Sequence, residues 1–432
     1  MKRSMAKAIR GAAVLALLLL PAMAVAQVGL SLPPVQDDEV RGVRFGQFVW
    51  VPFLGIEGRY NSNVFRQDSR EGRSEAGILT LRPGFSLGNP NYSWLHLTWD
   101  ASVDVNFWFS DDPNVRKQGR VAAETGLRAE FFPKSVVGFY IADRFQRTST
   151  PPNESSTQRY DRNFNHVGAG IQVRPGSALD FSLGYAYAFD LFDRFSEGDR
   201  SFHEVRLLAL WKFFPKTLFL GDVDWRYQQW STAQTGFRSG SMPLRAALGV
   251  RGFVTRQLAL EVRAGYGQGF YREGSDVQTF IGKAALAWMP TPFTLVDFGY
   301  QRDFEDASFY GRWFTTDSLR LKVAQQFLRR VTLAGEFGWS YLSFPRVVPG
   351  TGDVPGYSSV TVSQEQRRDH ALKARLEVGY SALRYLSLKV GYQMDGILTG
   401  FRMTGTTPGG APLVDYGGWW VHQVFGEVQV LY

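Results

Sequence analysis

Cysteine is absent from this chain of 432 residues. That absence excludes a disulfide scaffold, a thiolate metal site, a cysteine nucleophile and a lipid-modified N-terminal cysteine. Charged residues are also sparse, at 20%, whereas aromatic residues make up 15% of the chain. This balance argues against disorder. The length is compatible with two or three domains, or with one large barrel.

Long hydrophobic runs are missing as well. The mean hydropathy is slightly negative, and no apolar run after residue 26 reaches the ~20 residues that a membrane-spanning helix needs. A polytopic helical membrane protein is therefore excluded. If the chain sits in a membrane, it must do so as a closed β-barrel.

The chain also lacks a strong excess of positive or negative charge. The net charge is +8, and four of these positive charges, Lys2, Arg3, Lys7 and Arg10, lie in the first 26 residues, which contain no acid. The remainder therefore carries a net charge of only +4. An excess this small does not predict a nucleic-acid partner.

The first 26 residues have the pattern of a secretory signal peptide. A basic start precedes the apolar run Ala12–Leu20, and Ala24-Val25-Ala26 supplies small residues for cleavage before Gln27. A transmembrane anchor is the alternative, but the apolar run is short for it. We expect residues 1–26 to be removed on export, residues 27–52 to form a periplasmic lead-in, and residues 53–432 to form the barrel.

From residue 53 onward the hydrophobic period is two. In the segment Leu179–Asp190, long aliphatic and aromatic residues alternate with small or polar ones for twelve positions. A strand tilted through a bilayer needs ~9–11 residues, whereas sandwich strands are usually about six residues long. The same alternation recurs at residues 95–107, 258–266, 331–341 and 386–395.

Short turns and longer polar segments alternate along the chain. Short turns are predicted near residues 89–91, 132–135, 174–177, 214–217, 255–257, 290–292, 328–330 and 381–384. This asymmetry predicts an all-β fold, a transmembrane antiparallel β-barrel of about 18 strands, with short turns in the periplasm and long loops outside. A propeller or solenoid is the alternative, but its loops would not segregate to one side.

Two segments carry a family resemblance. The predicted first strand, Gly55–Arg66, contains the run Tyr-x-Ser-Asn-Val-Phe-Arg at residues 60–66. This run resembles the opening strand of outer-membrane barrels encoded with exopolysaccharide and exosortase systems. The segment Trp419–Tyr432 ends on an aromatic residue and resembles the C-terminal signal read by the barrel-assembly machinery, although Gly426 lies one position earlier than in that signal.

Strand count and hairpin style over residues 53–432 are similar to those of eighteen-strand porins associated with exopolysaccharide export. The resemblance implies a passive conduit in the Gram-negative outer membrane, surrounded by outer-membrane lipid, that passes a secreted polysaccharide. It also implies a periplasmic polysaccharide-export protein as partner.

Alternation predicts which charged side chains line the lumen. The candidates are Asp100, Asp104, Arg128, Arg206, Asp224, Arg226, Arg245, Arg251, Arg263, Lys283, Arg320, Lys322, Arg375 and Lys389. The stretch from Arg206 to Lys322 contributes more cations than anions, which favours acidic glycans. Mutual pairing of these charges is the alternative. Trp108, Tyr140 and Trp230 are candidate sugar-stacking residues, with packing roles as the alternative.

No catalytic, cofactor or metal site is predicted. The five histidines stand alone, no pair has metal-ligand spacing, and His96 is the best of a weak set of catalytic candidates. The run Gly265-x-Gly267-x-Gly269 lies inside a predicted strand, so it is not a nucleotide loop. Polysaccharide export is the leading hypothesis. A general or solute-selective porin, a barrel enzyme and a plugged structural barrel are the alternatives.

Overall fold

The computed structural model describes most of the chain. The described residues are 42–68, 72–89, 94–153, 161–193, 198–230, 240–272, 275–307, 313–346, 360–364, 366–406, 412–415 and 418–432. The predicted signal peptide and most of the lead-in lie outside them and stay predictions.

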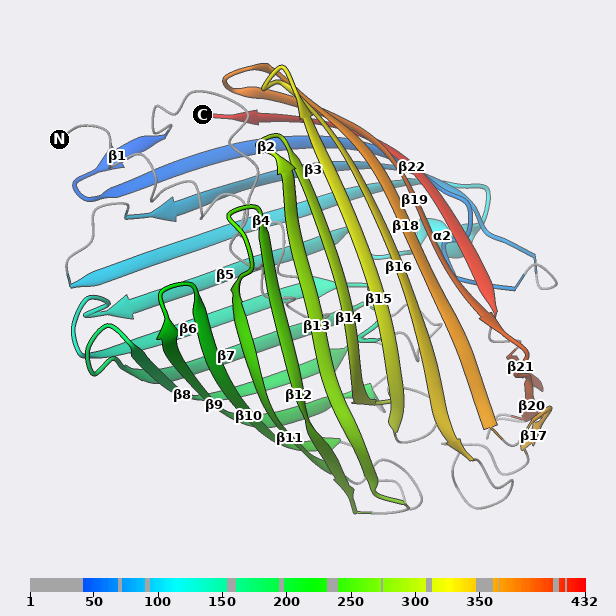
Figure 1. Ribbon diagram of the computed structural model, residues 1–432. Helices are drawn as coiled ribbons and strands as arrows, with labels where there is room; N and C mark the ends of the chain where they lie inside the picture. Colours follow the sequence, from blue (N-terminus) through cyan, green and yellow to red (C-terminus); the bar gives the residue numbers. More distant parts are fainter. Residues whose placement is uncertain are drawn as a thin grey trace.

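The barrel is closed and antiparallel (Figure 1), and it consists of eighteen long strands. Each strand pairs with the next along the chain, and β22 (Trp419–Leu431) pairs with β2 (Phe48–Asn61) to close the ring. The predicted all-β barrel of about 18 strands is confirmed. The other barrel strands are β3 (Ala76–Gly88), β4 (Leu95–Phe109), β5 (Val121–Phe131), β6 (Val137–Thr148), β7 (Arg162–Val173), β8 (Leu179–Phe192), β9 (Arg200–Phe214), β10 (Thr217–Trp230), β11 (Ser241–Phe253), β12 (Leu258–Tyr271), β13 (Val277–Thr291), β14 (Thr294–Asp306), β15 (Trp313–Phe327), β16 (Val331–Arg346), β18 (Gln366–Leu383) and β19 (Leu386–Thr399).

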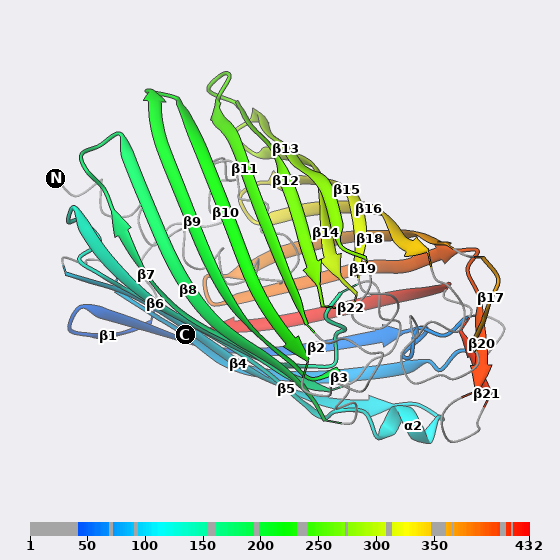
Figure 2. The same cartoon turned by 90° about the horizontal axis from the view of Figure 1, so that it is seen from below.

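Connections differ in length at the two ends of the barrel. Only two residues separate β9 from β10, whereas 19 residues separate β16 from β18 and also β19 from β22. A short helix, α2 (Pro113–Arg116), and a small sheet of β17 (Val360–Val362), β20 (Met403–Thr406) and β21 (Pro412–Asp415) lie at the long-loop end (Figures 1 and 2). The alternation of turns and loops follows the sequence prediction.

The first strand differs from its predicted bounds. The ladder begins at Phe48, before residue 53, and β1 (Val43–Phe45) pairs with the start of β2. Strand β2 ends at Asn61, so most of the run at residues 60–66 lies beyond the strand. The Asn63 side chain bonds to the backbone of Gln67 and Trp420. Such side-chain bonds to nearby backbone compete with ladder pairing and end the strand.

The two faces of each strand are chemically distinct. On β8, Phe181, Leu183 and Tyr185 are exposed, while Ala188 and Asp190 on the other face are buried. An apolar cluster lies near the long-loop ends of β15 to β22 and consists of Ala307, Phe314, Leu342, Phe344, Ala371, Ile397, Phe401, Trp419 and Val421. Among the described residues, none of the helices has the length and apolar character to cross a membrane.

Candidate functional site: the inner wall

Contacts between non-adjacent strands identify the inner face of the barrel. Arg245 on β11 pairs with Asp303 on β14, with 2.9 Å between Nε and Oδ1. Gln228 on β10 donates to the carboxylate of Asp306 on β14 at 3.0 Å. Strands three or four places apart are separated by about 14–19 Å along the wall. Their side chains can therefore meet only on the concave, lumen side.

The strand register places the predicted lumen residues on this same face. Asp224 is directly opposite both Arg206 and Arg245, and Arg251 is opposite Glu261. Strand alternation and register put the other candidates on the inner face as well: Asp100, Asp104, Arg128, Arg226, Arg263, Lys283, Arg320, Lys322, Arg375 and Lys389. A role in transport remains a prediction for each of them.

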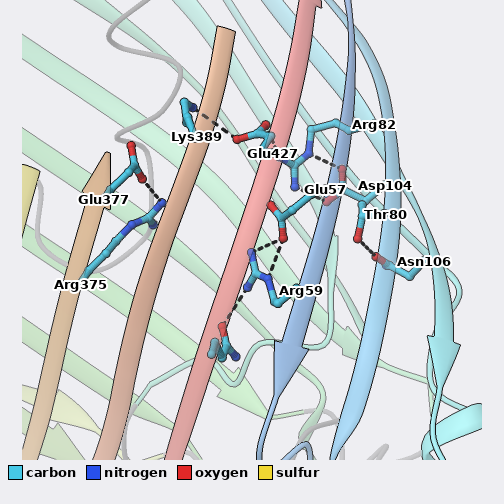
Figure 3. Close-up of polar contacts among 11 residues, drawn as sticks. Glu57, Arg59, Thr80, Arg82, Asp104, Asn106, Arg375, Glu377, Lys389 and Glu427 are labelled. Atoms are coloured by element: carbon cyan, nitrogen blue, oxygen red, sulfur yellow. Dashed lines mark hydrogen bonds and ion pairs between the residues drawn. The ribbon is translucent and has the colours of Figure 1, made fainter. Parts of the chain in front are cut away.

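Charges on the wall around β2, β3 and β22 are largely matched, as Figure 3 shows. Arg82 bridges Asp104 at 2.6 Å and Glu427 at 3.5 Å, and Lys389 approaches Glu427 at 3.4 Å. Beside this group Arg375 pairs with Glu377 at 2.6 Å. Mutual pairing, the alternative to a free cationic surface, describes this part of the wall.

Three cations surround Glu261 on the wall formed by β11, β12 and β13. Its carboxylate lies 2.5 Å from Arg251, 2.8 Å from Arg263 and 3.0 Å from Lys283. The Glu261 side chain has no exposed area, whereas 26% of the Arg251 side chain is exposed. One buried carboxylate thus holds three positive groups in fixed positions.

Asp222 on β10 extends this cluster. It pairs with Arg206 at 2.8 Å and with Arg263 at 3.3 Å. Four cations consequently share two carboxylates, which leaves two positive charges in excess. The adjacent wall has one more carboxylate than cations: Arg226 pairs with Glu204, and Arg245 pairs with both Asp224 and Asp303.

Arg320 and Lys322 lie further round the wall, on β15. In the part of the chain that the structure describes, neither makes an ion pair within 4.0 Å. Lys322 lies opposite Asp297 and Glu336 in the register. Arg320 instead lies between Gly299 and Gly338, so it adds positive charge to this side of the lumen.

The predicted stacking residues are occupied by packing contacts. A Cβ added at Gly170 would lie 2.4 Å from the Tyr140 ring, so this ring packs against the wall at Gly170. The guanidinium carbon of Arg128 lies over the same ring, 4.7 Å from its centroid. The Trp108 indole donates to the carbonyl of Gly119, and Arg200 lies 5.5 Å from the Trp230 ring. All three aromatic side chains thus contact neighbouring protein groups, which agrees with a packing role rather than sugar stacking.

The histidines contact individual neighbours and form no cluster. His96 Nδ1 lies 3.3 Å from Glu130. His203 is 2.7 Å from the Tyr185 hydroxyl, on the outward face with the exposed aromatic residues. No group of three or more His, Asp or Glu side chains among the described residues is placed to hold a metal ion.

Sequence alternation missed a polar cluster at the long-loop end. Asp306 accepts hydrogen bonds from Ser241 and Tyr271, each at 2.5 Å, in addition to Gln228. The pairing of β14 with β13 stops at Arg302, and beyond it β14 turns toward the lumen. Strict alternation would place Asp306 outside, together with Tyr300 and Phe298.

The turned end of β14 also accounts for the glycine run on β12. Phe304 is fully buried, and a Cβ at Gly267 would lie 2.7 Å from its ring. A Cβ at Gly269 would lie 3.0 Å from the same ring. The glycines thus leave room for Phe304 against the inner wall. The glycine run beside an Asp-rich strand end was the sequence signal for this contact.

Residues 196–400 match the model of the family described as "Putative beta-barrel porin 2". No curated protein matches the sequence. The match covers less than half of the chain, and together with the closed barrel it shows that this chain is similar to porin-like β-barrels.

Solved structures also align with most of the chain. The FrpB iron transporter from Neisseria meningitidis in its apoprotein form is 7% identical, with a TM-score of 0.49, over 89% of this chain and 81% of that chain. Pseudomonas aeruginosa OpdK with vanillate is 11% identical, with a TM-score of 0.47, over 89% of this chain and 99% of that chain. Pseudomonas aeruginosa OccK11 is 11% identical, with a TM-score of 0.44, over 89% and 96%.

Proposed function

We propose that the barrel is an outer-membrane channel through which a secreted polysaccharide reaches the cell surface. The observation that carries the proposal is a closed ring of 18 strands whose inner wall bears charges along most of its circumference. Such a ring has a backbone diameter of about 36 Å, from the strand spacing and tilt of outer-membrane barrels. This diameter leaves room for a sugar chain after side chains are added.

The channel is a passive conduit with no chemistry of its own, and a periplasmic polysaccharide-export protein docks at the short-turn end. Hydroxyl-rich chains exchange hydrogen bonds readily with a wall of carboxylates, guanidinium groups and amides. The resemblance of residues 60–66 to exopolysaccharide-linked barrels supports this cargo.

Deletion of the gene tests the proposal. We expect surface polysaccharide to disappear while polymer synthesis continues, so that polymer accumulates inside the cell. Re-expression of the full chain should restore secretion. Normal surface polymer in the deletion strain, with the barrel confirmed absent from the membrane fraction, contradicts the proposal.

A solute-selective porin is the second candidate. The end of β14 is held against β10, β11 and β12 by Asp306, and a lumen narrowed there would suit small solutes. Liposome swelling distinguishes the candidates: rapid entry of monosaccharides and amino acids, together with unchanged polymer secretion after deletion, supports the porin and contradicts polysaccharide export.

A further inference from the structure

Five cations on one side of the lumen outnumber their counter-ions. They are Arg206, Arg251, Arg263, Lys283 and Arg320, and we call them the basic band. Only Asp222 and Glu261 pair with them within 4.0 Å among the described residues. The band thus has three more cations than close carboxylate partners, although Asp224 lies opposite Arg206 in the register and adds a negative charge beside it. The cations are also more exposed than their partners: 54% of the Arg206 side chain is exposed against 16% for Asp222, and 26% of the Arg251 side chain against none for Glu261.

We propose that the basic band is a binding site for the acidic groups of a saccharide, as uronic-acid residues carry them. This inference rests on the proposed function and names the class of polymer that the channel passes. Excess charge on a low-dielectric wall concentrates anions near it. Cations that are more exposed to the lumen than their carboxylate partners therefore favour an acidic chain over a neutral one.

The cations of the band are held in place before any ligand arrives. Arg251 directs Nε and Nη2 at Glu261, and Arg263 divides its donors between Glu261 and Asp222. Each guanidinium carries five N–H donors, so donors remain for a second carboxylate. Fixing side chains in advance lowers the entropy cost of binding.

The wall between the two halves of the band is open. Glu261, Ala285, Gly299 and Arg320 are consecutive partners across β12 to β15. A Cβ placed at Gly299 would meet no atom within 4 Å. An acidic group can therefore lie over Gly299, with Arg320 on one side and the Glu261 cluster on the other, about 10–14 Å apart by strand spacing.

Arginine suits this ligand. Its planar fork matches the two oxygens of a carboxylate, and bidentate pairs of this kind are among the stronger hydrogen-bonded contacts in proteins. A free oxyanion such as phosphate would use the same donors, so the experiment has to separate the saccharide from the charge.

The test is calorimetric titration of the full-length barrel folded in detergent. The probes are a hexamer of galacturonic acid, the neutral hexamer maltohexaose, and inorganic phosphate. We expect the acidic hexamer to bind at least about tenfold more tightly than the neutral one, a difference of about 1.4 kcal/mol. Affinity should fall as salt rises, because screening weakens exposed charge pairs.

Two variants locate the site. Arg206→Gln with Arg320→Gln removes two cations while Asp222 keeps Arg263, and we expect the affinity for the acidic hexamer to fall about tenfold. The matched control is Arg256→Gln with Arg384→Gln, which removes the same charge from exposed residues in short turns. Affinity should stay within about twofold of the wild-type value in this control.

A second variant leaves the charge unchanged. Gly299→Leu fills the open wall between the two halves of the band, and we expect it to weaken acidic-hexamer binding while circular dichroism shows an intact barrel. This variant keeps the proposal testable if the double variant fails to fold.

Three results overturn the inference: equal affinity for the two hexamers, equal loss in the control variant, or phosphate binding as tight as hexamer binding. The proposed function fails separately. If deletion abolishes secretion but the barrel shows no acidic preference, only this inference is wrong. If the barrel binds the acidic hexamer but deletion leaves secretion intact, only polysaccharide export is wrong.

Discussion

Glu261 shows how much of the wall depends on one side chain. Its side chain is completely buried, and its single negative charge is shared among three cations. Removing one member of a buried ionic group leaves the others uncompensated, which is far costlier than losing an exposed pair.

We therefore expect Glu261→Gln to lower the free energy of unfolding by about 3 kcal/mol. Urea titration of the detergent-folded barrel measures it. Glu377→Gln is the matched control, because Glu377 pairs with Arg375, whose side chain is 44% exposed. Loss of this exposed ion pair should lower the free energy of unfolding by less than about 1 kcal/mol. Equal effects of the two substitutions contradict this account of the wall.

Glycines on the inner wall differ in the space they leave. A Cβ at Gly265 would lie 2.1 Å from the carbonyl oxygen of Ala246, whereas Gly299 has open space. A side-chain methyl at Gly265 forces the backbones of β11 and β12 apart, and overpacking of this kind costs about 1–3 kcal/mol.

We predict that Gly265→Ala reduces the yield of folded barrel, seen as a heat-modifiable band in gel electrophoresis, and that Gly299→Ala does not. Equal yields would show that the wall near Gly265 adjusts freely to a methyl group.

At the scale of the strand, the seam between the first and last strands is fixed by the segment after β2. Ser62 exchanges two hydrogen bonds with the backbone of His422, at 3.0 Å and 2.9 Å. The buried Asn63 amide donates to the carbonyls of Gln67 and Trp420, at 2.7 Å and 3.0 Å. The run that carries the family resemblance thus anchors barrel closure.

Asn63→Ala should lower the free energy of unfolding by about 1–3 kcal/mol, because it removes three partly buried hydrogen bonds between the Asn63 side chain and the backbone of Gln67 and Trp420. Hydrogen exchange should rise first in β2 and β22. The control is the exposed Asn114→Ala, which should leave exchange in both strands unchanged. Unchanged exchange at the seam in Asn63→Ala contradicts the anchoring role.

The inward end of β14 is a second element held by one residue. Asp306 ties it to β10, β11 and β12. We expect Asp306→Ala to release this end and to raise single-channel conductance in planar bilayers. Asp317→Ala, which removes an outward pair with Arg302, is the control and should leave conductance unchanged. Identical conductance of both variants and the wild type would show that β14 does not narrow the lumen.

At the scale of the whole molecule, the inward charges of β9 to β15 are nearly balanced in number, but cations such as Arg206 and Arg251 are more exposed to the lumen than Asp222 and Glu261. We predict a reversal potential that favours chloride over potassium in a tenfold KCl gradient, with smaller selectivity at high ionic strength as screening grows. Arg206→Gln with Arg320→Gln should shift the reversal potential toward zero. Cation selectivity of the wild-type channel contradicts this charge distribution.

The sequence by itself determined the barrel. Alternation over segments such as Leu179–Asp190 is local, because neighbouring side chains of a strand must point to opposite faces. Short turns and long loops then set strand number and orientation, so the inward face of Arg206 or Arg375 followed from counting. The resemblance at residues 60–66 suggested a cargo, but the sequence pattern did not show that this segment lies at the seam between β2 and β22.

Only the tertiary structure decided which charges are matched. Glu261 is 22 residues from Lys283 and 39 from Asp222 in the chain, and register brings their strands together. The inward turn of Asp306 and the cover of Arg128 over Tyr140 likewise depend on contacts across strands. Alternation fixes the face that a side chain occupies, whereas closure of the ring fixes its partners, because partners come from strands that the chain reaches only after a turn or a loop.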